Sequence, residues 1–361
     1  MENRIYNFSA GPAVLPEPSL KEAQENLMAL PGVGMSVMEI SHRSKTFDEI
    51  HATAKSNFRK LLGAGDDYEI LFLQGGASLQ FYMLPLNLMT PKKADYIVTG
   101  SWSKKAVKEA KRVGEVNVAA TTEEGVFNRV PKQDELTLDP EAAFVHFTSN
   151  NTIYGTQFTA EPETGDVPLL CDASSDIFHK PIDVNKYGAI YAGAQKNIGP
   201  SGVCAVVVRK DLLERVPENL PSMLDLKLMA EKDSLYNTPN VWGIYIISLT
   251  TKWLLENGGL SEMEKRNNEK AGILYDAIDG SGGYYKGHAE KESRSVMNVT
   301  WNLANADLEK KFVAEAAESG FSGLKGHRSV GGVRASVYNA FPKKGVEELA
   351  SFMKEFQRKN G

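Results

Sequence analysis

The feature that most constrains the fold is an alternation of short apolar runs with segments of helical period. The runs are rich in β-branched or aromatic residues and several are apolar almost throughout, which is typical of strands covered by helices on both faces. We predict strands at 68–74, 94–100, 115–120, 142–148, 167–173, 189–194 and 202–208, with helices at 78–89 and 103–114 between them. This pattern predicts an α/β domain with a mostly parallel, seven-stranded sheet flanked by helices.

The pattern changes after about residue 255. An amphipathic helix at roughly 260–279 leads through a glycine-rich turn to apolar segments at 295–303 and 331–339, with one helix between them and another at 346–359. Two or three strands packed on helices predict a smaller α+β C-terminal domain. We expect a large domain over 15–257 and a small domain formed by 1–14 and 258–361, since 361 residues suffice for two domains of about 150 residues.

Composition restricts the classes of partner and the compartment. The chain has 41 basic and 46 acidic residues, so no basic excess favours nucleic acid or an anionic membrane. No apolar run approaches the ~18 residues of a membrane helix, and MENRIYNFSAGPAVLP lacks the features of a secretory signal. Cys171 and Cys204 lie in apolar runs and fit neither a disulfide framework nor a zinc site. We expect a soluble, cytoplasmic protein without a metal.

Lys196 and Asp172 are the first candidates for chemistry. Lys196 follows Tyr191-Ala-Gly-Ala-Gln, where small residues let a flat ligand approach and a lysine at a core strand end can form a Schiff base. Asp172 ends another predicted strand and could pair with the protonated ring nitrogen of pyridoxal phosphate. The alternatives are a lysine that reaches the surface and an aspartate that caps a helix. The pair indicates cofactor chemistry more strongly than either residue alone.

Two further features suit a flat, phosphorylated ligand. The strand at 68–74 runs into Gly75-Gly76-Ala77-Ser78 and then a helix, whose first N–H groups could bind a phosphate. Trp102 follows the end of the next strand, where its indole could stack on a heteroaromatic ring. A tight turn and a packed tryptophan are the simpler interpretations. The turn has neither the P-loop nor the G-x-G-x-x-G spacing, which disfavours nucleotide binding.

Taken together, these residues resemble the class V aminotransferases of the fold-type I pyridoxal-phosphate enzymes. The resemblance covers essentially the whole chain. Beyond the lysine motif it rests on Asn7-Phe8-Ser9-Ala10-Gly11-Pro12, Ser41-His42-Arg43-Ser44, Gly326-His327-Arg328 and Gly332-Val333-Arg334-Ala335. It implies a homodimeric enzyme with shared active sites that interconverts 3-phosphohydroxypyruvate and glutamate with O-phosphoserine and 2-oxoglutarate in serine biosynthesis. The resemblance does not decide whether the enzyme also uses 4-phosphohydroxythreonine as a substrate.

The resemblance also implies a cofactor-binding set. Lys196 would hold pyridoxal phosphate covalently, Asp172 would pair with its ring nitrogen and Trp102 would stack on its ring. The remaining members of the set would bind its phenolic oxygen or its phosphate: Thr152, Ala77, Ser78 and Gln195, with Asn237 and Thr238 reaching the phosphate from the neighbouring subunit. For Asn237 and Thr238, an ordinary turn is the alternative.

A substrate-binding set follows in the same way. Arg334 would hold the α-carboxylate and Arg43 the distal group of glutamate or the substrate phosphate, because guanidinium groups bind such anions with two hydrogen bonds. His42, His327 and Arg328 would add phosphate contacts, the last two from the partner subunit. Many members of the family carry an arginine in the 75–78 turn, which this chain lacks. How the remaining cations share the substrate phosphate therefore stays open.

Three other functions compete with this one. A class V aminotransferase for unphosphorylated oxoacids, of the alanine–glyoxylate or serine–glyoxylate type, would need fewer cations. A cysteine desulfurase would need a mobile nucleophilic cysteine, which Cys171 and Cys204 do not provide in their buried strands. A non-catalytic binding protein on the same fold would not need both Lys196 and Asp172.

Overall fold

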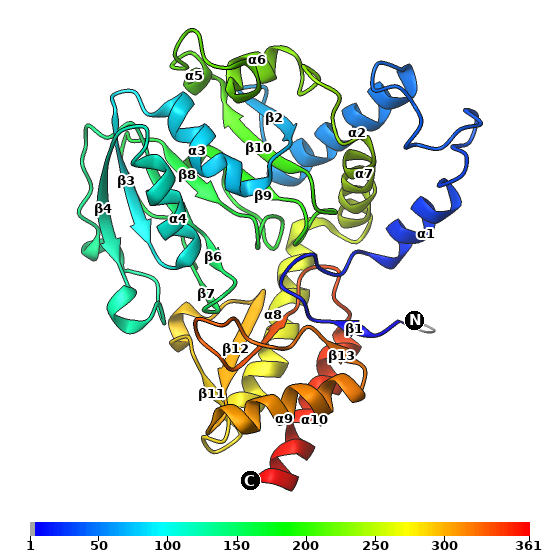
Figure 1. Cartoon of the computed structure of the whole chain (residues 1–361), viewed down its shortest axis with the longest axis vertical. Coiled ribbons are helices and arrows are strands. Elements are labelled where there is room, and N and C mark those ends of the chain that lie inside the picture. Colours follow the sequence, from blue (N-terminus) through cyan, green and yellow to red (C-terminus); the bar gives the residue numbers. More distant parts are fainter. Residues whose placement is uncertain (1–3) are drawn as a thin grey trace.

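The structure is a computed structural model that describes residues 4–361, so residues 1–3 of the predicted small domain lie outside the described residues. Its main sheet has seven strands in the order β2, β10, β9, β8, β5, β3, β4 (Figure 1). Their bounds are β2 Tyr68–Leu73, β3 Lys93–Val98, β4 Glu115–Thr121, β5 Val145–Thr148, β8 Leu169–Asp172, β9 Tyr187–Gly193 and β10 Cys204–Arg209. Only β10 runs antiparallel to its neighbours in this sheet. The predicted mostly parallel, seven-stranded sheet is confirmed.

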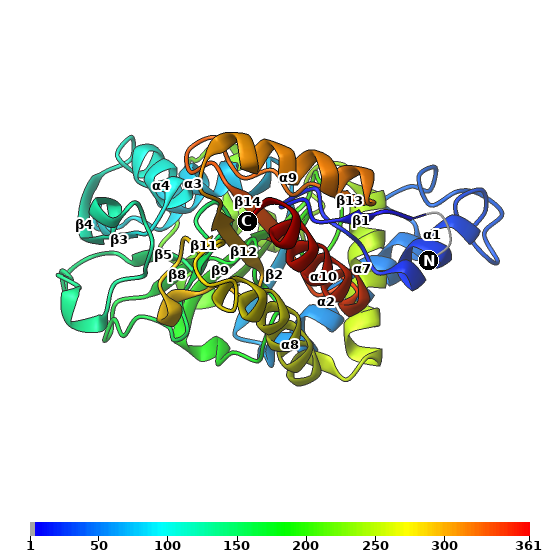
Figure 2. The same ribbon diagram turned by 90° about the horizontal axis from the view of Figure 1, so that it is seen from below.

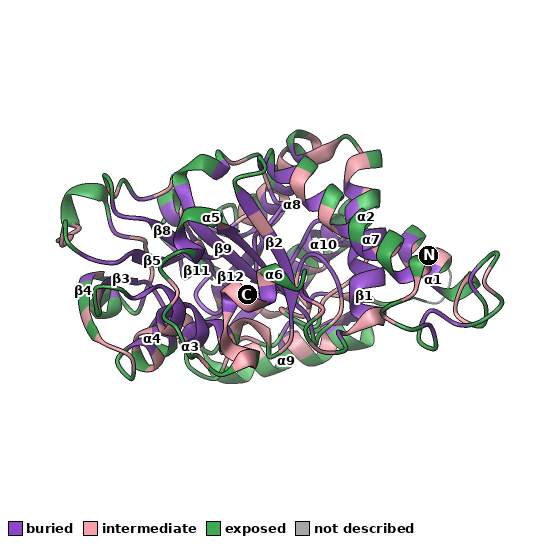
Figure 3. Ribbon diagram, turned by 90° about the horizontal axis from the view of Figure 1, so that it is seen from above, coloured by how far each residue is buried: buried purple, intermediate pink, exposed green. Residues whose placement is uncertain are grey.

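Helices cover both faces of this sheet. Because side chains alternate along a strand, Cys204, Val206 and Val208 of β10 pack on one side, and Ala205 and Val207 on the other. The first side is covered by α3 (Gly76–Leu88), α4 (Ser101–Ala110), α5 (Lys210–Leu213) and α6 (Leu226–Glu231). The second is covered by α2 (Lys45–Leu62) and α7 (Val241–Glu256), with α1 (Glu17–Glu25) packed against α7. In Figure 3 inner strands of the main sheet such as β8 and β9 are buried along their length, whereas the edge strand β4 is largely exposed and the helices expose their outer sides.

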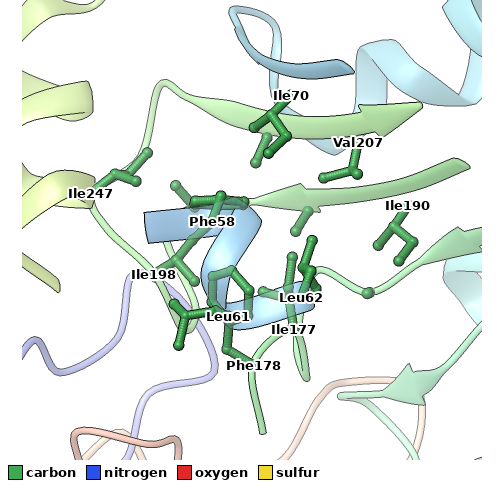
Figure 4. Packing of buried hydrophobic residues seen from close by; sticks show 14 of the residues in the cluster. Phe58, Leu61, Leu62, Ile70, Ile177, Phe178, Ile190, Ile198, Val207 and Ile247 are labelled. Atoms are coloured by element: carbon green, nitrogen blue, oxygen red, sulfur yellow. The ribbon is translucent and has the colours of Figure 1, made fainter. Parts of the chain in front are cut away.

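The packing on the second side is centred on α2 (Figure 4). The ring of Phe58 is fully buried and packs edge-on against Phe72, 5.3 Å between centroids, and against Phe178, 4.8 Å away. We expect Phe58→Ala to lower the free energy of unfolding by about 3–5 kcal/mol, because it leaves a cavity that its neighbours cannot fill. Urea denaturation measures this loss. Met28→Ala, at a side chain that is 84% exposed, serves as the control and should change it by less than about 0.5 kcal/mol.

The C-terminal part builds a second core below the main sheet (Figures 1 and 2). It contains α8 (Gly259–Asp279), α9 (Ala306–Glu318), α10 (Lys343–Asn360) and an antiparallel sheet of β11 (Lys286–Gly287), β12 (Asn298–Asn302) and β14 (Val333–Ser336). Near the other end of the chain, β1 (Tyr6–Asn7) pairs in parallel with β13 (Phe321–Ser322), and Phe8 is buried in this second core. This arrangement agrees with the predicted small α+β domain, whose exact boundaries stay a prediction.

A short hairpin of the large part contacts the small sheet. It consists of β6 (Asn150–Asn151) and β7 (Thr156–Gln157). Asn150 donates a hydrogen bond to Asn298 (Nδ2–Oδ1 2.8 Å), and Thr300 donates to the carbonyl oxygen of Tyr154 (3.0 Å). Both partners lie on β12, so the hairpin fixes the small sheet against the carboxyl edge of the main sheet.

Among residues 4–361, no helix combines the length and the apolar character needed to span a bilayer.

Candidate active site

A cavity of about 290 Å³ opens where the main sheet meets the small one. Its walls come from segments that follow β2, β3, β5, β8 and β9, which all run in the same direction, so it lies at their carboxyl ends. This is the edge at which open α/β sheets bind ligands. The lining residues are Ala10, Gly11, Gly76, Ala77, Ser78, Phe81, Trp102, Thr152, Ile153, Asp172, Ser174, Gln195, Lys196, His327 and Arg334.

Lys196 reaches this cavity from the turn after β9. Its Nζ lies 5.5 Å from the centroid of the Trp102 ring. Burial lowers the pKa of the Lys196 amine to about 8, an effect that the negative charge of Asp172 opposes and the positive charge of Arg334 reinforces. Gly11 packs against the lysine stem, because a Cβ at Gly11 would come within 3.1 Å of the Lys196 Cγ. The lysine is therefore held in place, and its neutral, nucleophilic form is accessible near neutral pH.

The lowered pKa has a measurable consequence in the cofactor-free protein. Only the neutral amine reacts with acetic anhydride, so the acetylation rate of Lys196 should reach half its maximum at about pH 8. In the urea-unfolded chain the same lysine should reach this point at about pH 10.4, the usual value for lysine. Competitive labelling with peptide mass spectrometry measures both curves. Coincident folded and unfolded curves would show that Lys196 is not desolvated.

Asp172, the last residue of β8, is buried. Burial raises the pKa of its carboxyl group, while Ser174 opposes the shift by donating from its backbone N (3.1 Å) and its Oγ (2.6 Å) to Oδ1. Ser174 also accepts a hydrogen bond from the backbone N of Gly193, which ties the Asp172 turn to the end of β9. Within the described residues Asp172 forms no ion pair, so a ligand cation placed beside it would favour the carboxylate.

Trp102 forms a flat wall of the cavity at the start of α4. Its Nε1 donates a hydrogen bond to the Thr152 hydroxyl (3.2 Å), which fixes the plane of the indole. The Nζ of Lys105 lies 4.2 Å from the centroid of the same ring. An aromatic ligand placed against Trp102 would have Lys196, Asp172 and Thr152 within the same cavity.

The turn after β2 suits an anion. Gly75 takes a left-handed conformation (φ 87°) and caps α3, whose first residues Gly76, Ala77 and Ser78 line the cavity. The first N–H groups of a helix have no partner within the helix, and the helix dipole favours a negative charge beside them. The predicted phosphate turn therefore has the required geometry.

Arg334 faces the cavity from β14 of the small sheet. Its Nη1 donates to the carbonyl oxygen of Thr152 (3.1 Å), whereas its buried Nε has no hydrogen-bond partner. Burial lowers the pKa of this guanidinium group. In the part of the chain that the structure describes, no carboxylate lies within ion-pair distance of Arg334. Such a cation is suited to an anionic ligand.

These groups fit the parts of pyridoxal phosphate one by one. An amine is present for its aldehyde, a carboxylate for its ring nitrogen, an indole for its ring and a helix N-terminus for its phosphate. The sequence profile of the class-V aminotransferases matches residues 5–349. The chain belongs to the class V aminotransferase family.

Relatives within this family are closely similar along the whole chain. A phosphoserine aminotransferase from Desulfatibacillum aliphaticivorans is 55% identical over 364 aligned residues that cover all of both chains. The phosphoserine aminotransferase from Bacillus circulans subsp. alkalophilus, a solved structure, is 49% identical with a TM-score of 0.98, again over all of both chains. A pyridoxal-phosphate-bound phosphoserine aminotransferase from Trichomonas vaginalis is 38% identical with a TM-score of 0.93, covering 97% of this chain and 100% of that one.

The cavity of this class V aminotransferase contains most, but not all, of the predicted site residues. It includes the whole cofactor set that one subunit should supply, together with His327 and Arg334. His42 and Arg43 lie instead on the loop before α2 and do not line it. Asn237 and Thr238 do not line the cavity either. Asn237 Nδ2 donates a hydrogen bond to Gln74 Oε1 (3.1 Å), and Gln74 Nε2 donates one to the carbonyl oxygen of Thr238 (2.9 Å). Their assignment to a neighbouring subunit stays a prediction.

His327 lines the cavity of its own chain, whereas the adjacent Arg328 is exposed. The contribution of both residues from a partner subunit stays a prediction. Burial lowers the pKa of His327, and the charges of Arg334 and Arg328 lower it further. Its Nδ1 lies 2.6 Å from the Ser329 hydroxyl. A neutral imidazole favours an anion less than an imidazolium would, so Arg334 is the cation that the predicted substrate-binding set contributes to this cavity.

Proposed function

We propose that this chain is a phosphoserine aminotransferase that uses pyridoxal phosphate to interconvert 3-phosphohydroxypyruvate and L-glutamate with O-phospho-L-serine and 2-oxoglutarate. The observation that carries the proposal is a single cavity containing the Lys196 amine, the Asp172 carboxylate and the Arg334 guanidinium, whose buried Nε has no hydrogen-bond partner. Full-length relatives named phosphoserine aminotransferase support the choice of substrate. The reaction would serve L-serine biosynthesis.

Each residue has a role that follows from its position. The cofactor, when bound, supplies an electron sink for the negative charge that develops on the α-carbon of the amino acid. Arg334 binds the substrate α-carboxylate and so orients the Cα–H bond toward Lys196. The Lys196 amine, with its pKa at about 8, takes the α-proton as general base and returns it as general acid. Asp172 would stabilise a positive charge on the ring nitrogen, and Trp102 would provide a flat surface for the ring.

Other roles depend on a second copy of the chain. We propose a cytoplasmic homodimer in which Asn237 and Thr238 of one subunit complete the phosphate site of the other, with Ala77, Ser78 and Gln195. His42, Arg43 and Arg328 would contribute to substrate recognition at the same shared site. Asn237 and Thr238 do not line the cavity of their own chain, and this supports the proposal.

An absorbance spectrum tests the proposed function. Purified protein supplied with pyridoxal phosphate should show the band of a lysine-bound cofactor. Addition of O-phosphoserine should convert this band to that of pyridoxamine phosphate and release 3-phosphohydroxypyruvate. A response to alanine or serine but not to O-phosphoserine would leave the cofactor in place and refute the substrate. A protein without the band would refute the enzyme.

A variant of Arg328 distinguishes the proposed phosphorylated substrate from the alternative, an unphosphorylated oxoacid. That alternative draws support from the exposed position of Arg43, which leaves few cations at the cavity of one chain. We expect Arg328→Ala to reduce kcat/KM for 3-phosphohydroxypyruvate by about tenfold or more, because a charge-assisted hydrogen bond contributes roughly 1.5–3 kcal/mol. Turnover of glyoxylate, in contrast, should stay within about twofold of wild type. Equal losses on both acids would exclude phosphate recognition by Arg328.

A further inference from the structure

Three consecutive backbone carbonyls next to the site each accept a hydrogen bond from a different asparagine. They belong to Ile177, Phe178 and His179, shortly after the Asp172 turn. All three residues are buried, and Phe178 takes a left-handed backbone conformation (φ 64°), which is costly for a residue with a bulky side chain. Such a conformation persists only where its surroundings impose it.

The three donors come from three separate segments. Asn197 Nδ2 donates to the Ile177 carbonyl oxygen (2.6 Å), Asn339 Nδ2 to that of Phe178 (2.8 Å) and Asn267 Nδ2 to that of His179 (3.1 Å). The asparagines are also joined to one another. The backbone N of Asn339 donates to Asn197 Oδ1 (3.0 Å), and Asn267 Nδ2 donates to Asn339 Oδ1 (2.7 Å).

A buried lysine completes the network from α8. Lys270 lies one turn after Asn267 and is 2% exposed. Its Nζ donates to the carbonyl oxygens of Val337 (2.8 Å), Tyr338 (2.6 Å) and Phe341 (3.3 Å), which surround Asn339. The Lys270 side chain thus holds the segment that follows β14.

The network joins the three chain segments that carry the candidate site. Asn197 is the residue after Lys196, Asn339 follows the strand of Arg334, and the three carbonyls follow Asp172 and its hydrogen-bond donor Ser174. Burying three asparagine side chains is favourable only where their polar groups are paired, and in this network every Nδ2 and Oδ1 except the Oδ1 of Asn267 has a partner. Backbone amides or water could satisfy single carbonyls, but they would not connect three distant segments.

We propose that Asn197, Asn267 and Asn339, which we call the asparagine clamp, are positioning residues that, together with Lys270, fix Lys196 relative to Asp172 and Arg334. The effect on catalysis rests on the proposed function, whereas the effect on Lys196 itself does not. Reacting groups must be held within about 0.5 Å for efficient catalysis, and small displacements reduce rates steeply. The clamp supplies this rigidity from outside the cavity, since none of its members lines it.

The test compares Asn197→Ala and Asn339→Ala with Asn57→Ala. Asn57 is a matched control, because it is also buried and donates two hydrogen bonds, to the Ser248 carbonyl oxygen (3.4 Å) and the Thr251 hydroxyl (3.2 Å), between α2 and α7. All proteins are measured at the same interval below their own melting temperatures. The first readout is the pH profile of Lys196 acetylation without cofactor. The second is steady-state kinetics with glutamate, which gives kcat and KM as separate values.

We expect the Lys196 profile of both clamp variants to shift toward higher pH by about half a unit or more, because the amine is less well shielded from water. Their kcat should fall by about tenfold or more, and their KM for glutamate should rise as Arg334 is displaced. Asn57→Ala should lose stability with an unshifted profile. Should Asn339→Ala not fold, Asn339→Ser, which keeps a small polar side chain and adds no charge, allows the same comparison.

The outcomes separate the two proposals. Clamp variants whose Lys196 profiles coincide with that of Asn57→Ala would overturn the positioning role, even in a protein that transaminates O-phosphoserine. Shifted profiles in a protein that does not transaminate O-phosphoserine would support the positioning of Lys196 and refute the proposed substrate.

Discussion

Replacing Lys196 by alanine is expected to reduce transamination of O-phosphoserine by at least about 10⁴-fold, the upper range for a general acid–base group. Among the residues that line the cavity, Lys196 carries the only amine. No other described side chain there can both bind an aldehyde covalently and move the α-proton. Single-turnover measurements with saturating cofactor give the rate of the chemical step without the contribution of product release.

A small external amine provides the control for this variant. The cavity left by the missing side chain can admit methylamine, which should restore part of the lost rate in Lys196→Ala, with a dependence on the concentration of the free base. The same amine should not restore activity to a variant that has lost a different group. Wild-type turnover by Lys196→Ala would remove the lysine from the mechanism.

The second large effect is expected from Asp172→Asn, which keeps the shape of the side chain and removes its charge. Breaking a buried ion pair costs about 3–5 kcal/mol, so kcat should fall by about 150- to 5,000-fold if Asp172 stabilises a cation on the cofactor ring. Covalent attachment of the cofactor to Lys196 should survive, since the lysine is unchanged. Steady-state kinetics together with the absorbance spectrum separate these two properties.

Ser174→Ala is the matched control for Asp172→Asn. It removes the hydrogen bonds from the Ser174 hydroxyl to Asp172 and from Gly193 to that hydroxyl, but it keeps the carboxylate. We expect kcat to fall by about 10- to 150-fold, because one hydrogen bond to a charged group contributes roughly 1.5–3 kcal/mol. A larger loss in Ser174→Ala than in Asp172→Asn would show that the geometry of this turn, rather than the charge, determines the rate.

The main sheet could be predicted because its strands are covered on both faces and therefore appear as continuous apolar runs. Strand ends differ from the prediction by up to three residues, as at β5, which begins at Val145 rather than at residue 142. Buried residues continue beyond the residues that form hydrogen bonds between strands. An apolar run in the sequence therefore predicts which residues are buried better than it predicts where strand pairing begins and ends. The helix α7 was not predicted, since it is apolar nearly all round and lacks a polar face that would reveal its period.

The candidate site could be predicted where a local motif carries it. Lys196, Asp172 and the turn at Gly75 each stand at a strand end that can be recognised from neighbouring residues. Ser174 was missed, although an Asp-x-Ser sequence is a local signal for a turn. The asparagine clamp had no such signal, because its members are far apart in the sequence and meet only in the folded chain.

The pairing of β1 with β13 has a consequence for the chain during translation. Tyr6 and Asn7 can pair only after Phe321 and Ser322 have been synthesised. In the same way, the carbonyl oxygen of Ala10 accepts a hydrogen bond from the hydroxyl of Tyr338 (2.7 Å), which is added later still. These partners are added more than about 310 residues later, which takes roughly 15–60 s at about 5–20 residues per second. The cavity wall formed by Ala10 and Gly11 therefore closes over Lys196 only after nearly the whole chain has been synthesised, so the burial that lowers the Lys196 pKa is completed late.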